Sequence, residues 1–414
     1  MHSMSDEDGG ARKSSVTGKP RTKKRIRPRR GKRLLKFDSN RVKGLCRRVT
    51  SSIASILPVQ TATNATFMER DIAMAFAYAS CGRLFLEGTS AQLNALGLAP
   101  SADRLVALVS QVPWSNLLES FRRENERILG RAKTEGKIPA KATVGLDMHR
   151  VPRHRRAERR YKGKRDARDL PMAVAGKRVA GTNLAHQFAT IDLVGGQPRL
   201  TFDVMPWFHG SRYRDTVSRL IEGARRWVDV DLLLMDREFL NEDSVGAAID
   251  AGVHFLIPAK ETERVKTAKE RCRGLTHLVE PYKIGDYTVN LVVVDTECIG
   301  EEEGHIAFVT DLPGEMWREL ALMYSKRWGI ETGYREKEGF RARTCSLSYP
   351  VRLLLFLVSV LAATIWAIEK ERCPVSWHDR MPAHLARFAI ALCILAHYEP
   401  ELLEMVLAAM AEAD

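Results

Sequence analysis

Two aspartates end apolar segments of the chain and could act together. Asp147 closes the segment Ala142–Asp147 (ATVGLD), and Asp236 directly follows Val230–Met235 (VDLLLM). Both segments predict β-strands, and in open α/β sheets ligands bind at the carboxyl ends of strands. A carboxylate there can reach a metal ion, whereas one in mid-strand would be buried without a partner. The alternative is that each aspartate only caps the turn or helix that follows.

A polar helix supplies further candidates. The pattern predicts one long helix over Glu315–Phe340. One face of this helix is polar where a simple amphipathic helix would be apolar, so we expect charged groups opposite it. At 3.6 residues per turn, that face consists of Tyr324, Arg327, Glu331, Arg335 and Glu338.

Two aspartates and one glutamate suit a pair of Mg²⁺ ions. Mg²⁺ prefers oxygen ligands and keeps several waters, so three carboxylates suffice. Two such ions about 3.5–4 Å apart clamp the attacking and leaving oxygens of an in-line phosphoryl displacement. Asp147, Asp236 and Glu331 are therefore candidate metal ligands, although capping by strand-end aspartates would explain the same spacing.

Several segments resemble DDE transposases of bacterial and archaeal insertion sequences. The spacing Tyr324-x2-Arg327-x3-Glu331 is similar to the Y-x2-R-x3-E part of their signature. VGLDMH and LLLMDREF resemble the first and second Asp motifs, and GTNLAHQFATIDLV resembles the strand pair after the first Asp. YSKRWGIETGYREKEGF and SYPVRLLLFLVSVLAATIWAI resemble the C-terminal helices of halobacterial-type members. The resemblance covers roughly residues 140–370, and it is specific as a combination of motifs.

This resemblance implies a fold, a cofactor and roles for residues. The fold would be an RNase H-like α/β catalytic domain with a β insertion between the second Asp and the Glu, flanked by N-terminal and C-terminal all-α regions. Asp147, Asp236 and Glu331 would form the catalytic, metal-binding triad for two Mg²⁺ ions, with Mn²⁺ able to substitute. Tyr324, Arg327 and Arg237 would contact DNA phosphates; the alternative for the arginines is an ion pair with Glu331 or Glu315.

One position departs from the family signature, which has a lysine seven residues after the glutamate. Here that position is Glu338, and the lysine comes one step earlier, at Lys337. On an ideal helix Lys337 points about 100° away from the signature position. Arg335 lies one turn beyond Glu331 and could take the place of the signature lysine. We expect Lys337 or Arg335 to contact DNA phosphate.

Positive charge is concentrated in two blocks. The chain has a formal net charge of +14, yet residues 1–33 carry +9 and residues 150–168 carry +8, so the remainder carries −3. Dense basic blocks are typical of segments that contact phosphates, although the first could be only a disordered tail. The second block directly follows the first motif Asp, and we expect it to grip DNA beside the site. Its candidate residues are Arg153, Arg155, Arg156, Arg159, Arg160, Lys162, Lys164 and Arg165.

Changes in pattern divide the chain into four predicted parts. Residues 1–33 form a disordered basic arm and 34–138 a helical DNA-binding region, which contains a helix-turn-helix or a plain helical hairpin around Gly97. Residues 139–345 form the catalytic domain, in the order β-β-β-α-β-α-β and with a β insertion at about 262–312. Residues 346–414 form a helical region.

Other kinds of site find little support. No phosphate-binding loop and no G-x-G-x-x-G motif is present, so we expect no nucleotide cofactor. Cys373, His378 and His384 lack the paired spacing of a zinc site. The longest apolar run, Leu353–Ile368, is shorter than the roughly 20 residues that span a bilayer, so we expect a core helix and no membrane. His149 could touch the site, but a solvated loop position is favoured.

These observations predict a DNA transposase of the DDE type. It would cut DNA at transposon ends and transfer the strand to target DNA, as a homodimer on DNA, by positioning and charge neutralisation without a covalent protein intermediate. The alternatives are a metal-dependent nuclease without strand transfer and a catalytically decayed DNA-binding protein. Scattered cysteines and the absence of a secretory signal favour the cytoplasm, in association with the nucleoid.

Overall fold

The computed structural model describes most of the chain after its basic arm. The described residues are 39–154, 172–299, 304–325, 328–371 and 383–398, except 60, 62, 180, 196 and 197. The side chains of 39, 176–179, 325, 328–331, 371 and 398 also fall outside the description. The predicted arm at 1–33 and most of the second basic block therefore lie outside the described residues.

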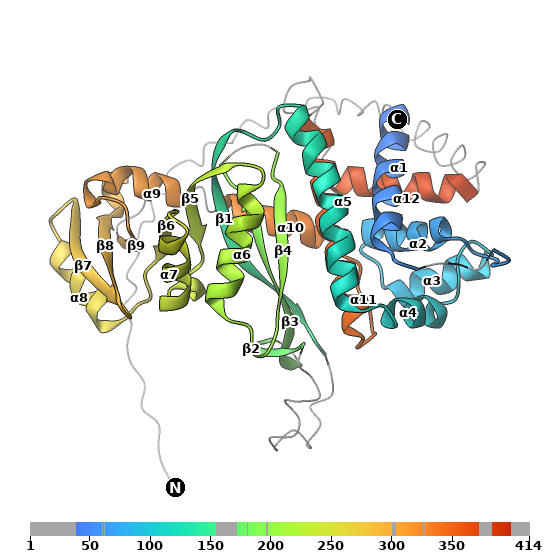
Figure 1. Ribbon diagram of the computed structural model, residues 1–414, viewed down its shortest axis with the longest axis horizontal. Helices are drawn as coiled ribbons and strands as arrows, with labels where there is room; N and C mark the ends of the chain where they lie inside the picture. Colours follow the sequence, from blue (N-terminus) through green and yellow to red (C-terminus); the bar gives the residue numbers. More distant parts are fainter. Residues whose placement is uncertain are drawn as a thin grey trace, which may run out of the picture. The chain divides into compact units, whose positions relative to one another are not determined.

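A mixed sheet forms the centre of the described structure (Figure 1). Its strand order is β2-β3-β1-β5-β6-β9-β8-β7, and β4 pairs with β3 outside this order. β1 pairs antiparallel with β3 and parallel with β5, and β5 pairs parallel with β6. The bounds of these strands are Lys141–Pro152 for β1, Val174–Val179 for β2, Thr182–Leu193 for β3, Thr201–Trp207 for β4, Asp229–Met235 for β5 and His254–Pro258 for β6. This antiparallel start and parallel continuation confirm the α/β order expected of an RNase H-like fold.

The strands of the predicted insertion continue the same sheet. β9 (His305–Thr310) pairs antiparallel with β6, and β8 (Tyr287–Asp295) and β7 (His277–Ile284) follow it outward. The insertion opens with a helix, α8 (Glu263–Cys272), which the sequence analysis did not predict. Strand β2 was also missed.

Helices cover both faces of the sheet. Along β5, Leu233 and Met235 pack into the main core, whereas Leu232 and Leu234 pack into a second core, because successive side chains of a strand point to opposite faces. The first face carries α6 (Tyr213–Arg225) and α7 (Glu242–Asp250). Figure 1 shows α6 in front of the sheet and α10 behind it.

The predicted helix over Glu315–Phe340 is described in two segments on either side of residues 326–327. Glu315 lies in a short 3₁₀ turn, and two helices follow it, α9 (Trp317–Ser325) and α10 (Trp328–Gly339). α9 contacts β8, whereas α10 contacts β1 and α11. Residues 326–327, between α9 and α10, lie outside the described residues, so the continuous polar face expected from the spacing stays a prediction.

The N-terminal and C-terminal helices pack together beside the sheet. α11 (Tyr349–Glu371) contacts α1, α2, α4 and α5, and α12 (Ala383–Tyr398) contacts α1 and α2. The bounds are Ser39–Ile56 for α1, Glu69–Gly82 for α2, Leu86–Ala95 for α3, Ala102–Ser110 for α4 and Trp114–Thr134 for α5. One continuous apolar core joins these helices to the sheet. The predicted boundaries near 138 and 345 therefore separate elements that share a core.

Two local expectations in the helical regions are confirmed. α3 and α4 flank Gly97, whose φ of 71° is the left-handed conformation, and the hydroxyl of Ser101 caps α4 by accepting a hydrogen bond from the Arg104 N–H. In the described residues, the segment Tyr349–Lys370 is long and apolar enough to span a membrane, with a mean hydropathy of 2.3, but it is entirely buried inside the protein. It is a core helix, as expected.

Candidate active site

Asp147 and Asp236 lie side by side on one face of the sheet. Leu146 of β1 is paired with Met235 of β5 in parallel register, so the next residue of each strand is one of the two aspartates. Neighbouring strands lie about 4.8 Å apart, and residues at one level point the same way. Both aspartates are half-buried, which leaves their carboxylates within reach of solvent.

The two aspartates differ in local contacts. An Asp147 carboxylate oxygen accepts the backbone N–H of Met148 at 2.6 Å. Asp236 precedes the 3₁₀ turn Arg237–Phe239, and among the described residues its side chain makes no capping hydrogen bond to this turn. The capping explanation for a strand-end aspartate therefore does not account for Asp236.

Helix α10 covers the two aspartates through Tyr334. The Tyr334 hydroxyl lies 2.8 Å from the Thr190 hydroxyl, and Thr190 is the cross-strand partner of Asp147. Its ring stacks on His149, with centroids 5.5 Å apart. Burial raises the pKa of Tyr334 well above its usual value, and the negative charges of Asp147, Asp192 and Asp236 raise it further. α10 therefore faces a group of carboxylates.

Glu331 belongs to α10, three residues before Tyr334. Residues three apart in a helix share a face, and this spacing is the basis of the prediction for Glu331. Its side chain is outside the described part of the structure, and its role as third metal ligand stays a prediction. Among the described side chains, no group of three His, Cys, Asp or Glu is arranged to hold a metal ion. The two aspartates fit a divalent metal site in donor type and placement.

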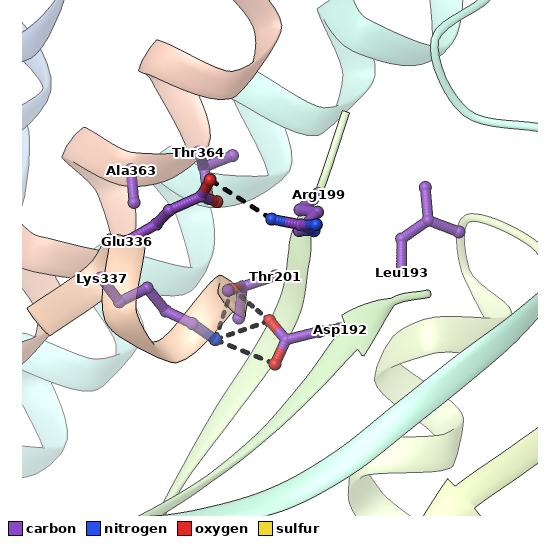
Figure 2. Close-up of a pocket in the computed structure, with 9 residues that line it drawn as sticks. Asp192, Leu193, Arg199, Thr201, Glu336, Lys337, Ala363 and Thr364 are labelled. Atoms are coloured by element: carbon purple, nitrogen blue, oxygen red, sulfur yellow. Dashed lines mark hydrogen bonds and ion pairs between the residues drawn. The ribbon is translucent and has the colours of Figure 1, made fainter. Parts of the chain in front are cut away.

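Lys337 is held inside the protein, and its predicted contact with DNA stays a prediction. Lys337 is only 5% exposed, and its ammonium donates to both Asp192 carboxylate oxygens, at 2.8 and 2.9 Å. The Thr190 and Thr201 hydroxyls donate to the same carboxylate. Figure 2 shows the Lys337 side chain pointing from α10 toward Asp192 on β3. Because both charges are enclosed, this ion pair ties α10 to the sheet.

Glu338, at the signature lysine position, also faces protein groups. Arg341 donates two hydrogen bonds to its carboxylate, at 2.8 and 2.6 Å, and His149 Nε2 lies 3.5 Å from it. Burial acts to raise the pKa of Glu338, but His149 and Arg341 outweigh it and lower the pKa to about 2. His149 is a buried strand residue rather than a solvated loop residue, and burial lowers its pKa.

The other predicted DNA contacts fall into three groups. Arg237 and Arg335 are exposed and available to a ligand. Tyr324 packs against Phe308 at 4.7 Å between ring centroids, and Arg153 is only 5% exposed, which does not suit a surface grip on phosphate. The remaining candidates lie outside the described residues: Arg327, Arg155, Arg156, Arg159, Arg160, Lys162, Lys164 and Arg165.

Sequence reasoning missed Asp192 and Tyr334. Asp192 stands in the apolar run ATIDLV, and a buried carboxylate requires a partner. That requirement could have directed attention to a buried cation such as Lys337. Tyr334 lies one turn beyond Glu331, so its helical spacing was the available signal.

Comparison with known proteins agrees with the fold and the motifs. Residues 211–366 match the family model of the transposase DDE domain. This range includes Asp236 and Glu331 but not Asp147, which the strand register places beside Asp236. The resemblance to DDE transposases is therefore confirmed for this part of the chain, whereas a bacterial or archaeal origin stays a prediction.

The fold is also similar to that of a solved transposase. The structure resembles that of the piggyBac transposase, determined by cryo-EM as a synaptic complex with hairpin DNA. The TM-score is 0.53 at 11% sequence identity, and the likeness covers 89% of this chain and 80% of that chain. At this identity the likeness concerns the fold, and it extends to the helical regions. Among curated proteins, none matches the chain significantly by sequence.

Proposed function

We propose that this protein is a DNA transposase that cleaves DNA at the ends of a mobile element and joins them to target DNA. The observation that carries the proposal is the parallel register of β1 and β5, which sets Asp147 beside Asp236 beneath α10. The match of residues 211–366 to the transposase DDE domain supports the same reaction class. The fold similarity to a transposase solved with DNA is consistent with it.

The described residues suggest a division of labour. Asp147 and Asp236 would hold two Mg²⁺ ions, or Mn²⁺ in their place, with Glu331 as the ligand contributed by α10. When bound, these ions would neutralise charge on the attacking and leaving oxygens. Water would attack the phosphodiester at the element end and release a 3′-OH, and that hydroxyl would then attack target DNA. The exposed Arg237 and Arg335 would hold DNA phosphates.

Assembly and location extend this proposal. Joining two element ends to one target needs two active sites held together, so we expect a homodimer on DNA. We also expect the protein to act in the cytoplasm, at the nucleoid. We expect no nucleotide cofactor, because the strand transfer reaction uses the phosphodiester bonds of DNA.

The test is cleavage and strand transfer on end-labelled duplexes that carry the inverted repeats flanking the gene. We expect Asp236→Asn to abolish both steps. Asp231→Asn is a matched control, because Asp231 lies on the same strand, is exposed and pairs with Lys141 at the surface. Cleavage that persists in Asp236→Asn would refute the proposal. Cleavage by the wild type without joining would instead identify a nuclease, and DNA binding without cleavage a decayed transposase.

A further inference from the structure

A basic pocket lies at the end of β1, away from the two aspartates. Its volume is about 520 Å³, within the range of pockets that hold small-molecule ligands. Three arginines, Arg341, Arg343 and Arg352, line it together with His154, and the lining residues that the structure describes include no aspartate or glutamate. A pocket of this composition favours an anionic ligand.

The buried wall of the pocket holds positive charge in place. Arg352 is 8% exposed and donates to two backbone carbonyls, Ser346 O at 2.7 Å and Pro152 O at 3.1 Å. These acceptors are uncharged, so they fix the guanidinium without neutralising it. Burial lowers the pKa of Arg352, and the neighbouring positive charges of Arg153 and Arg341 lower it further. Glu87 acts on Arg352 in the opposite direction, and Arg341 is already paired with Glu338, so an anion in the pocket would face chiefly the charges of Arg343 and Arg352.

The open rim combines a cation with an aromatic ring. Arg343 and Phe85 are both exposed, and the Arg343 guanidinium lies 6.0 Å from the centre of the Phe85 ring. Backbone hydrogen bonds of 2.9 Å in both directions join Arg343 to Leu84 and Leu86. An exposed aromatic ring next to arginine is a common platform for a nucleotide, since the ring stacks on a base and the guanidinium holds a phosphate.

The pocket is within reach of DNA held at the two aspartates. Val151 lines the pocket and lies four residues beyond Asp147 on β1, which corresponds to about 13 Å of strand. DNA rises about 3.4 Å per nucleotide along one strand. A DNA strand that is bound at Asp147 and runs along β1 would therefore reach the pocket about four nucleotides from the cleaved bond.

We propose that this pocket binds a DNA backbone phosphate about four nucleotides from the cleaved bond, with the adjoining base against Phe85. The inference rests on the proposed function, because it requires DNA at the aspartates. It adds Arg343 and Phe85 as DNA-binding residues from two distant segments. Neither residue belongs to the transposase motifs.

The test measures DNA affinity of the full-length chain by fluorescence anisotropy, at several salt concentrations and in EDTA to prevent cleavage. Arg343→Ala should reduce the slope of log affinity against log salt by about 0.9, the value for one lost phosphate contact. Arg343→Lys should keep that slope. Phe85→Ala should weaken binding roughly tenfold, as loss of one stacked base predicts, with the slope unchanged.

Arg273→Ala is the matched control, because Arg273 is exposed but follows α8 at the far side of the sheet. Fold is checked by the urea midpoint; Arg343→Ala should retain it, since the hydrogen bonds of Arg343 to Leu84 and Leu86 use only backbone atoms. Duplexes with one uncharged methylphosphonate then locate the contact: substitution near the fourth phosphate should weaken wild type but not Arg343→Ala.

Two results overturn the inference in different ways. If the wild type binds and cleaves DNA and Arg343→Ala has the same salt slope, the pocket does not bind DNA phosphate, and the proposed function is unaffected. If the wild type binds no DNA, both the pocket inference and the proposed function are refuted. Thermal protection by free inorganic phosphate that is lost in Arg343→Ala, with normal DNA binding, would assign the pocket to a free anion and also overturn it.

Discussion

Neutralising Asp192 should destabilise the protein through the ammonium that it holds. Asp192→Asn preserves the shape of the side chain but removes the charge that faces Lys337. The two Lys337–Asp192 contacts are 2.8 and 2.9 Å long, and the side chains are 6% and 11% exposed. The uncharged amide would leave Lys337 buried without a counter-charge, next to the Tyr334 ring 4.5 Å away.

The expected loss is about 3–5 kcal/mol, the cost of removing one partner of a buried ion pair. Domains are typically stable by about 5–15 kcal/mol, so the urea midpoint should fall by about a fifth or more. Lys337→Met should also destabilise, because it leaves the Asp192 carboxylate with only the two threonine hydroxyls. The double variant should lose less than the sum of the single losses, since it leaves no unpaired charge.

Urea unfolding followed by tryptophan fluorescence measures these differences, with Asp231→Asn as the exposed control. DNA cleavage measured beside it reports on α10, because a loosened helix would misplace Glu331. An Asp192→Asn variant as stable as wild type would refute the reasoning. So would a double variant whose loss equals the sum of the two single losses.

Three further predictions concern acid, salt and metal. Burial lowers the pKa of His186 from 6.5 to about 4. The unfolded chain therefore takes up the proton more readily than the folded protein, and the free energy of unfolding falls by up to about 3 kcal/mol as the pH drops from 6.5 to 4. His186→Phe should shrink the difference in urea midpoint between pH 7 and 4.5, and an unaltered difference would contradict this. Arg335→Ala should reduce the salt slope of DNA binding by about 0.9, whereas Lys337→Met should not; a reduced slope in Lys337→Met would mean that its ammonium reaches DNA. EDTA should stop cleavage by the wild type, and added Mg²⁺ should restore it. Mg²⁺ should not restore cleavage by Asp147→Asn. Cleavage by the wild type in EDTA would exclude a role for metal.

The strands and their terminal aspartates were predictable from the sequence. Apolar runs such as VDLLLM define strands that are buried on both faces, and the chain order of strands and helices restricts how they pair. The adjacency of Asp147 and Asp236 follows from that pairing. Local pattern and topology were therefore sufficient for this half of the site.

The spacing of residues did not predict which strands the helical segments between Glu315 and Phe340 would cover. α9 packs on β8 and α10 on β1, and these strands are four positions apart in the sheet, about 19 Å. Helical periodicity carries no information on which strand a helix will cover. The inward turn of Lys337 likewise depends on Asp192, 145 residues away in the chain.

The shared core of the terminal helices has a consequence for synthesis on the ribosome. α1 and α5 pack against α11, yet about 300 residues separate the end of α1 from the end of α11. At about 5–20 residues per second, the apolar faces of the first helices would wait roughly 15–60 s for their partner. The nascent chain therefore exposes these apolar faces during this interval, and a chain that ends before Tyr349 would lack α11 to cover them.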